Sequence, residues 1–307
     1  IAVIITFSSL KRCFFSSRTV LQQAAVLFFV SFWGILCVSL STTTLSCTER
    51  TVKFKNIRKN VAYVTGWVGD EATLKKMARI PPVPLKNQSY FVSNNRHVLQ
   101  KASLQGWKTT YYEVMTDEAL KTASEAEKQV FWTNAGKRMK VFPQSFISDR
   151  EYHFVAWLDN KWNWNTVGTE DAIARWNPDT VVQFHRHEFV CCGADLEYKA
   201  SMPQPRYYLQ REQYQNYMYQ EVSKGFLLNG PRHPCATYIL YNLRHNASAD
   251  FQNTWFDHIQ RCGIQDQISL YFVAQRFPAP LLAEFLPALK ETFLSLMYRK
   301  LTSFNMC

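Results

Sequence analysis

A long stretch without charge near the start of the chain constrains its fold more than any other feature. Between Thr19 and Thr48 there is no Asp, Glu, Lys or Arg, and residues 21–40 are predominantly apolar. A helix rises about 1.5 Å per residue, so roughly 20 apolar residues cross the hydrocarbon layer of a membrane. The sequence therefore predicts a single transmembrane helix over residues 21–41.

Positive charges set the expected orientation of this helix. The basic residues just before it are Lys11, Arg12 and Arg18. Because positive residues favour the cytosolic side, we expect a cytosolic tail at 1–20, a signal anchor at 21–41, a stem at 42–58 and a lumenal domain at 59–307. A cleaved signal peptide is the alternative, although the apolar stretch is longer than a usual signal-peptide core.

Charge and cysteine content bear on partners and compartment. The net charge of +11 favours anionic partners such as nucleotide phosphates, but no nucleic-acid-binding motif accompanies it, so nucleic acid is not expected as a partner. The cysteines after the apolar stretch, which allow up to three disulfides in an oxidising lumen, are Cys47, Cys191, Cys192, Cys235, Cys262 and Cys307. The N-glycosylation sequons at Asn87 and Asn246 are compatible with lumenal exposure.

Apolar runs and helical patterns alternate through the first half of the domain. The expected strands are 60–66, 89–93, 106–114, 152–159, 180–185 and 235–241. The expected helices are 71–79, 116–140, 169–176, 206–224, 250–261, 265–275 and 281–301. This alternation predicts an α/β domain with an open, mostly parallel sheet flanked by helices.

Two acidic positions are the best local signals for chemistry. Asp159 ends an apolar strand candidate, and ligands of open α/β sheets bind beyond the carboxyl ends of strands. A carboxylate there can hold Mg²⁺ or Mn²⁺ against a diphosphate, or can simply occupy a turn. Asp266 and Gln267 open a late helix after Gly263, where they either reach an acceptor cleft or only cap the helix.

Two basic clusters are candidates for binding phosphate. The first follows a strand candidate and consists of His185, Arg186 and His187, in which histidine can ligate metal and arginine can pair with phosphate. The second consists of Lys137, Arg138 and Lys140, which either neutralise a diphosphate or lie solvated at a helix end. No Walker, G-x-G-x-x-G or G-x-S-x-G motif occurs, so dehydrogenase, ATPase and serine-hydrolase functions lack their local signatures.

Taken in order, several short motifs resemble a known family. They are Val61-Ala-Tyr-Val-Thr65, Lys137-Arg138-Met-Lys140-Val-Phe-Pro143, Trp157-Leu-Asp-Asn-Lys161, Gln183-Phe-His-Arg-His187, the 210–225 helix with Gln213 and Tyr217, and Gln265-Asp-Gln-Ile-Ser-Leu-Tyr271. Over residues 60–276 the chain resembles the plant and bacterial glycosyltransferase-like family that includes the turgor-regulation-defect and mucilage-related Golgi proteins. Each motif is short, so their order and spacing carry the resemblance.

The resemblance implies a fold, an activity and a location. It implies a GT-A-like, Rossmann-type domain of a type II Golgi membrane protein that moves a sugar from a nucleotide-sugar donor to a glycan or glycoprotein acceptor. The Asp266-Gln267 pair is similar to one in retaining transferases of the glycogenin and xyloglucan-xylosyltransferase kinds. The resemblance therefore implies that both residues are catalytic, beside the anomeric carbon, and that the reaction retains configuration.

The remaining candidates belong to the donor side. We expect Asp159 and His185 at a metal, and the expected donor-binding residues are Lys137, Arg138, Lys161, Arg186 and His187. A D-x-D motif would place a second acid at 161, where Lys161 stands. Either Mn²⁺ or Mg²⁺ binds Asp159 with other ligands, or Lys161 meets the diphosphate without a metal. The alternative functions are a ceramidase-like lipid-amide hydrolase and a non-catalytic glycan-binding protein.

Overall fold

The computed structural model describes residues 60–70, 80–116, 118–147, 151–160, 163–164, 166–186, 193–230 and 234–285. All of them belong to one unit, residues 56–307. The predicted tail, anchor, stem and 71–79 helix lie outside the described residues. Within the described part, no helix combines the length and apolarity that a membrane span requires.

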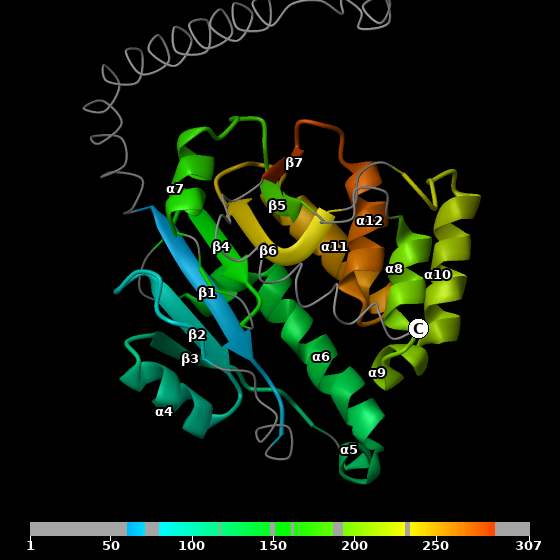
Figure 1. The fold of residues 1–307 in the computed structure, drawn as a ribbon, viewed down its shortest axis with the longest axis horizontal. Coiled ribbons are helices and arrows are strands. Elements are labelled where there is room, and N and C mark those ends of the chain that lie inside the picture. Colours follow the sequence, from blue (N-terminus) through cyan, green and yellow to red (C-terminus); the bar gives the residue numbers. More distant parts are fainter. Residues whose placement is uncertain are drawn as a thin grey trace, which may run out of the picture. The chain divides into compact units, whose positions relative to one another are not determined.

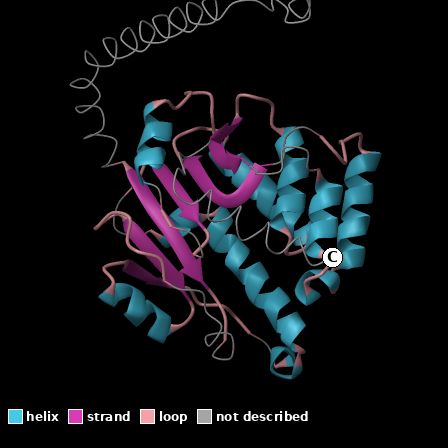
Figure 2. Cartoon of the chain, in the orientation of Figure 1, coloured by secondary structure: helices cyan, strands magenta, loops and turns pink. Residues whose placement is uncertain are grey.

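A seven-stranded sheet forms the centre of this unit (Figures 1 and 2). The strands are β1 (Val61–Trp67), β2 (Ser89–Ser93), β3 (Lys108–Tyr111), β4 (Phe154–Leu158), β5 (Val182–Arg186), β6 (Pro234–Asn242) and β7 (Leu282–Phe285). Their order is β3-β2-β1-β4-β6-β5-β7, and only β6 runs antiparallel to its neighbours β4 and β5. The predicted α/β class with a mostly parallel sheet flanked by helices is thus confirmed.

Helices cover both faces of the sheet. The α-helices of the described residues are α4 (Arg96–Leu104), α5 (Ala119–Thr122), α6 (Glu125–Val141), α7 (Thr166–Ala174), α8 (Ala194–Ser201), α9 (Pro205–Tyr208), α10 (Arg211–Ser223), α11 (Ser248–Cys262) and α12 (Asp266–Arg276). Alternate residues of a strand point to opposite faces. Val64 and Trp157 share a core with α6, α11 and α12, whereas Tyr63 and Ala156 share one with α7. Both faces are therefore buried, which explains the continuous apolar run of β4.

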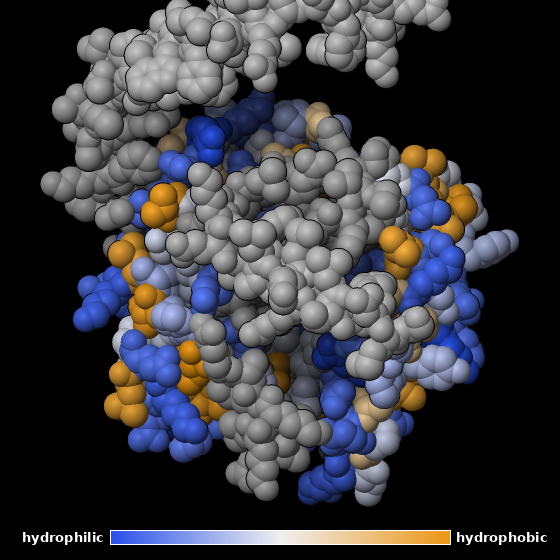
Figure 3. Space-filling model, in the orientation of Figure 1, coloured by the Kyte–Doolittle hydropathy of each residue, from blue (hydrophilic) through white to orange (hydrophobic). Residues whose placement is uncertain are grey.

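A separate helical cluster lies beside the sheet. Buried residues of α8, α9 and α10 pack with the start of α12, among them Tyr207, Tyr214 and Tyr217, and α8, α10 and α12 stand side by side in Figure 1. On the face seen in Figure 3, the described surface over these helices mixes hydrophilic and hydrophobic side chains. The cluster places α8 and α9 opposite the end of β1 and so adds a wall to the sheet edge.

Two buried cysteines are free thiols, Cys235 in β6 and Cys262 at the end of α11. Neither therefore takes part in the disulfides that the cysteine count allows. The other cysteines of the predicted lumenal part lie outside the described residues.

Some predicted elements are wrong in type or extent. The helix expected at 281–301 begins instead as strand β7, because residues 282–285 pair in parallel with β5. The helix expected at 116–140 breaks before α6, because the Ser124 side chain caps a new helix there. The helix expected at 206–224 is divided into α9 and α10, and neither α4 nor α8 is predicted by the sequence patterns.

Candidate active site

Asp159 lies directly beyond the carboxyl end of β4. Its backbone N–H donates to the Thr237 carbonyl of β6 (2.9 Å), and its Oδ1 accepts from Trp157 Nε1 (3.0 Å). Strands β1, β4 and β5 all point toward this edge, because β1 is parallel to β4, and β4 and β5 are both antiparallel to β6. The carboxylate is therefore fixed where open α/β sheets bind their ligands.

Helix α6 supplies two buried lysines. A capping box between Ser124 and Glu127 fixes the start of this helix. Lys137 and Lys140 are three residues apart, so they lie on one face of α6. Each is only 7% exposed, and an ammonium group at such a depth requires anionic partners.

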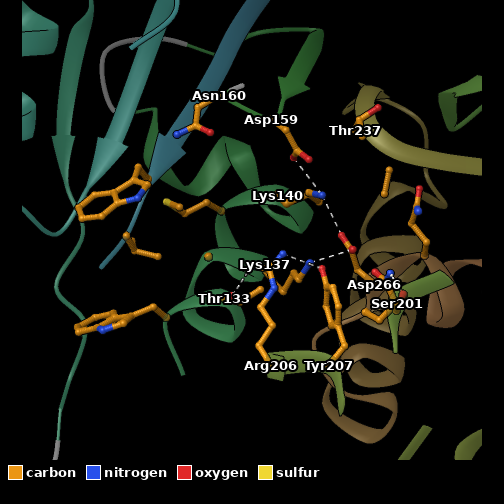
Figure 4. A pocket seen from close by; sticks show the side chains of 18 of the residues that line it. Thr133, Lys137, Lys140, Asp159, Asn160, Ser201, Arg206, Tyr207, Thr237 and Asp266 are labelled. Atoms are coloured by element: carbon orange, nitrogen blue, oxygen red, sulfur yellow. Dashed lines mark hydrogen bonds and ion pairs between the residues drawn. The ribbon is translucent and has the colours of Figure 1, made fainter. Parts of the chain in front are cut away.

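Asp266 is the anionic partner that these two lysines share. Its Oδ1 lies 2.8 Å from Lys137 Nζ, and its Oδ2 lies 2.9 Å from Lys140 Nζ, close enough for an ion pair. Lys140 Nζ is also 3.1 Å from Asp159 Oδ1. The four groups therefore form a continuous chain of alternating charge, from Lys137 through Asp266 and Lys140 to Asp159 (Figure 4).

A glycine turn delivers Asp266 to this position. Gly263 ends α11 with a φ of 111°, and a Cβ there would lie 2.8 Å from Tyr214 and 2.9 Å from Gln210. Only glycine adopts this conformation without strain and without meeting those side chains. Gln210 Oε1 then accepts the Ile264 backbone N–H (2.9 Å), which fixes the chain just before α12.

Burial and ion pairing act against each other on these charges. Burial alone would raise the pKa of Asp266, but Lys137 and Lys140 hold this pKa well below the ordinary carboxyl value. Burial alone would lower the pKa of Lys140, but Asp159 and Asp266 raise it above the ordinary lysine value. At Lys137 burial prevails over Asp266, and the pKa is lowered. At neutral pH, Asp266 is therefore ionised and Lys140 protonated.

The charged chain lines a cavity of about 490 Å³. The ends of β1 and β4, the start of β6, one face of α6, helices α8 and α9 and the start of α12 all contribute to its walls. The aromatic residues that line it are Trp67, Trp132, Trp157 and Tyr207. Flat aromatic surfaces beside fixed charges suit a ligand that has a ring and an anionic group.

Amide side chains form a second polar group in the cavity. Gln265 Nε2 and Gln267 Nε2 both donate to Glu197 Oε1 of α8, each at 2.8 Å. Gln265 Nε2 also lies 2.6 Å from Ser201 Oγ. All four side chains line the cavity that contains Asp266. Sequence patterns gave no signal for Glu197 or Ser201, because α8 itself was not predicted.

Arg206 adds a further cation that the sequence patterns did not single out. It is the second residue of α9 and lines the cavity, with its guanidinium 4.6 Å from the centre of the Tyr207 ring. Its Nη2 donates to Gln204 Oε1 (3.2 Å) and to Tyr207 Oη (3.1 Å). Sequence patterns predicted only an amphipathic helix here, which did not distinguish Arg206 from its exposed neighbours.

The structure brings some of the predicted site residues together and separates others. The cavity contains Asp159, Asp266, Gln267 and Lys137. Arg138 is exposed and is not among the lining residues, because it follows Lys137 on α6 and turns to another face. His185 also lies outside the lining, in β5 opposite Cys235. Lys161, His187 and the side chain of Arg186 lie outside the described residues.

The described side chains do not form a ready metal site. Among them, no group of three or more His, Cys, Asp or Glu residues is arranged to hold an ion. The Lys140 ammonium lies between Asp159 and Asp266, so a divalent cation that bridged these carboxylates would have to displace it. The prediction of a metal at Asp159 and His185 stays a prediction.

Comparisons with known proteins yield likeness only at the level of structure. No family model and no curated protein sequence matches the chain. Mouse xyloside xylosyltransferase 1 in its apo form is similar over 73% of this chain and 84% of that one, with 12% identity and a TM-score of 0.44.

Two further solved structures give weaker likenesses. Glycosyltransferase GlyE of Streptococcus pneumoniae TIGR4 is similar over 80% of this chain and 50% of its own, with 10% identity and a TM-score of 0.38. The apo bifunctional glycosyltransferase WbbM is similar over 74% of this chain and 38% of its own, with 9% identity and a TM-score of 0.35. Likenesses of this size do not define a function, which depends instead on the chemistry of the site.

Proposed function

We propose that this protein is a glycosyltransferase that moves a sugar from a nucleotide-sugar donor to a glycan or glycoprotein acceptor. The observation that carries the proposal is the single cavity in which the strand-end acid Asp159 and the helix-start pair Asp266–Gln267 meet. The motif resemblance noted in the sequence points to the same class. A GT-A-like domain fits the position of this cavity at the carboxyl edge of a mostly parallel sheet.

The donor diphosphate is the ligand group that the lysines suit best. An ammonium group has three N–H donors, and the ion pairs of Lys137 and Lys140 leave some of them for phosphate oxygens. Arg206 of α9, which also lines the cavity, can add a planar guanidinium. Catalysis would come from neutralising charge on the departing nucleoside diphosphate in a site already organised for it.

The sugar and the acceptor would lie on the side of Asp266 and Gln267. A carboxylate and an amide hydrogen-bond to sugar hydroxyls, and a fixed acceptor hydroxyl beside the anomeric carbon lowers the entropic part of the barrier. Retention of anomeric configuration rests on the resemblance of the Asp-Gln pair alone. The type II Golgi location rests in the same way on the predicted anchor at 21–41.

A metal ion is proposed here as an addition to the cations of the protein itself, with Asp159 as its ligand. With Lys140 between the two carboxylates, the described cavity has an internal cation of its own. Asp159 would then supply one carboxylate ligand to a Mn²⁺ or Mg²⁺ ion, which would help to neutralise the donor diphosphate. A ceramidase-like hydrolase is less favoured, because charged and amide side chains line the cavity that would have to hold an acyl chain.

A thermal-unfolding panel tests the proposal. The full chain is mixed with nucleotide sugars and free nucleoside diphosphates, each with Mn²⁺ and with a chelator. A ligand at 100 times its Kd stabilises the folded state by about 2.7 kcal/mol, which raises the Tm by roughly 5–10 °C for a domain of this size. We expect at least one nucleotide sugar to produce such a shift.

Two neighbouring residues of α6 provide matched variants. Lys137→Met removes a cavity ammonium while Lys140 still pairs with Asp266, whereas Arg138→Met changes an exposed side chain. From the dependence of Tm on donor concentration, we expect Lys137→Met to weaken the apparent affinity for the donor at least tenfold. Arg138→Met should show the same donor-induced Tm shift as the wild type. Equal donor-induced Tm shifts in both variants would show that the donor binds outside this cavity. The absence of a Tm shift with every nucleotide sugar would contradict the transferase function.

A further inference from the structure

The carboxylate of Glu197 controls how two amide side chains of the cavity are turned. Its Oε1 accepts the Nε2 groups of Gln265 and Gln267, both at 2.8 Å. A carboxylate oxygen accepts hydrogen bonds, so in both contacts the NH₂ group of the amide is turned toward Glu197. The carbonyl oxygen of each amide is thereby turned away from Glu197.

At Gln267 this orientation leaves a buried acceptor with nothing to accept from. Gln267 lines the cavity beside Asp266, and its Oε1 is buried without a hydrogen-bond partner among the described residues. Buried polar atoms in native proteins nearly always have a partner, so an exception in a cavity calls for an explanation. A hydroxyl group of a bound ligand would supply the missing donor.

We propose that Glu197 is a positioning residue, which fixes the Gln267 amide so that its carbonyl oxygen accepts a hydrogen bond from a hydroxyl of the sugar in the cavity. This inference rests on the proposed function and adds the part of the site that recognises the sugar. Glu197 itself need not touch the substrate. Glu197 disfavours the alternative orientation of the Gln267 amide, in which the NH₂ group would replace the carbonyl oxygen and would offer the sugar a donor.

The surroundings of Glu197 suit such a role. It lies on α8, where the Ser201 hydroxyl donates to the Glu197 backbone carbonyl one turn earlier (2.7 Å). Ser201 is also in contact with the Gln265 amide (2.6 Å) and is 2% exposed. Helix α8 and the start of α12 are thus joined by a buried network, which holds Glu197 and Gln267 in a fixed relation.

The test compares a sugar with its deoxy analogues. The full chain is assayed for nucleoside diphosphate release from the nucleotide sugar that stabilises it most, and from each monodeoxy form of that sugar. For the wild type we expect one analogue to lose about 10- to 100-fold in kcat/KM, the size of one hydrogen bond with a buried partner. Glu197→Ala should lose a similar factor on the natural sugar and discriminate less than about threefold against that analogue.

Further variants separate positioning from stability. The effect of Glu197→Ala should fall below about threefold when Gln267 is already alanine, but should persist when Gln265 is alanine. The double variant Glu197→Gln/Gln267→Glu keeps the total charge and reverses the direction of the hydrogen bond between the two side chains. Its Glu side chain at 267 again offers an acceptor to the sugar, so this variant should be more active than Glu197→Ala. Glu212 is an exposed acid of α10, and Glu212→Ala should leave the discrimination between the sugar and its deoxy analogue unchanged.

The outcomes distinguish this inference from the function on which it rests. If the wild type releases nucleoside diphosphate and discriminates, but Glu197→Ala discriminates equally well, the positioning role is wrong and the transferase stands. If Glu197→Ala and Gln267→Ala act additively, the positioning role is again wrong. If the wild type releases no nucleoside diphosphate from any donor, the proposed function fails and this inference fails with it.

Discussion

Asp266 is the single residue on which most of the charge balance in the cavity depends. It pairs with both buried lysines, so Asp266→Asn leaves Lys137 without an anionic partner and Lys140 with only Asp159. Removing one partner of a buried ion pair costs about 3–5 kcal/mol. We expect Asp266→Asn to lower the free energy of unfolding by this amount in urea titrations at pH 7.

An exposed ion pair provides the control for that measurement. Glu212 is 78% exposed beside Arg211, and Glu212→Gln should change the free energy of unfolding by less than about 0.5 kcal/mol. If Asp266→Asn were as mild as this control, the buried charge chain would contribute nothing to folding. The electrostatic description of the cavity would then be wrong.

The cost of Asp266→Asn should also depend on pH. The pKa of Asp266 is lower in the folded chain than in the unfolded chain. Its stabilising contribution is therefore complete above the unfolded pKa of about 3.9 and is lost as the pH falls toward the folded value. The difference between wild type and Asp266→Asn should shrink by about 1 kcal/mol from pH 7 to pH 3. A difference that grew on acidification would contradict the sign of the pKa shift.

Sequence patterns indicated the acids of the site better than the contacts between them. Asp159 could be recognised because it ends a predicted strand, at the edge where open α/β sheets bind ligands, and Asp266 because it opens a predicted helix beside Gln267. The position of Lys140 between them could not be predicted, because it depends on how α6 packs on β1 and how its last turn approaches Asp266 at the start of α12. Glu197 was missed for the same reason, since its partners lie about 70 residues away in sequence.

At the scale of elements, two glycines that line the cavity should respond oppositely to alanine. In β1, a Cβ at Gly66 would lie 2.5 Å from the Val92 carbonyl oxygen of β2 and 3.0 Å from Met139 Sδ. In α6, a Cβ at Gly136 would meet nothing closer than Val68 Cγ2 at 3.4 Å. Gly66→Ala should therefore destabilise by about 1–3 kcal/mol, and Gly136→Ala should stabilise by about 0.5–1 kcal/mol.

Chemical unfolding of both variants at one pH checks this pair. Each substitution adds one methyl group and reduces the conformational freedom of the unfolded chain, so the sign of the change shows whether the folded chain has room for the methyl group. Two changes of the same sign would show that the approach of β1 to β2, or the course of α6, is not as described.

The elements of the sheet were predicted more accurately than the last part of the chain. Strand β2 was predicted with its bounds, and β4 and β6 within two residues, because their runs are short, rich in aromatic and β-branched residues and bounded by turn signals. The antiparallel direction of β6 was not predictable, since it depends on which strands it joins. Strand β7 was mistaken for a helix because its apolar residues fit both periodicities, and pairing with β5 decided between them.

At the scale of the whole molecule, the predicted topology can be tested through its sequons. Asn87 and Asn246 are both exposed in the structure, so neither is protected from a glycosylating enzyme by folding. If residues 59–307 are lumenal, we expect both to carry N-linked glycan in a eukaryotic host. Glycosidase treatment of the wild type, Asn87→Gln and Asn246→Gln would show two separate mobility shifts. An unmodified wild type would contradict the lumenal placement.

The central claim is that the cavity with Asp159, Lys140 and Asp266 acts on an activated sugar. The most direct test is the rate of nucleoside diphosphate release from a panel of nucleotide sugars by the full chain, for wild type and Asp159→Asn. Asparagine at 159 keeps an acceptor for Trp157 Nε1 and leaves Lys140 paired with Asp266, so the fold should persist. It removes the charge that fixes the Lys140 ammonium at the sheet edge.

We expect turnover of at least one donor by the wild type, and a rate about 100-fold lower for Asp159→Asn, as for the loss of one preorganised charge in an active site. Because Asp159 is less buried than Asp266 and Lys140 keeps Asp266 as a partner, the urea midpoint of Asp159→Asn should fall by less than that of Asp266→Asn. Equal rates for the two proteins, or no release from any donor, would contradict the central claim.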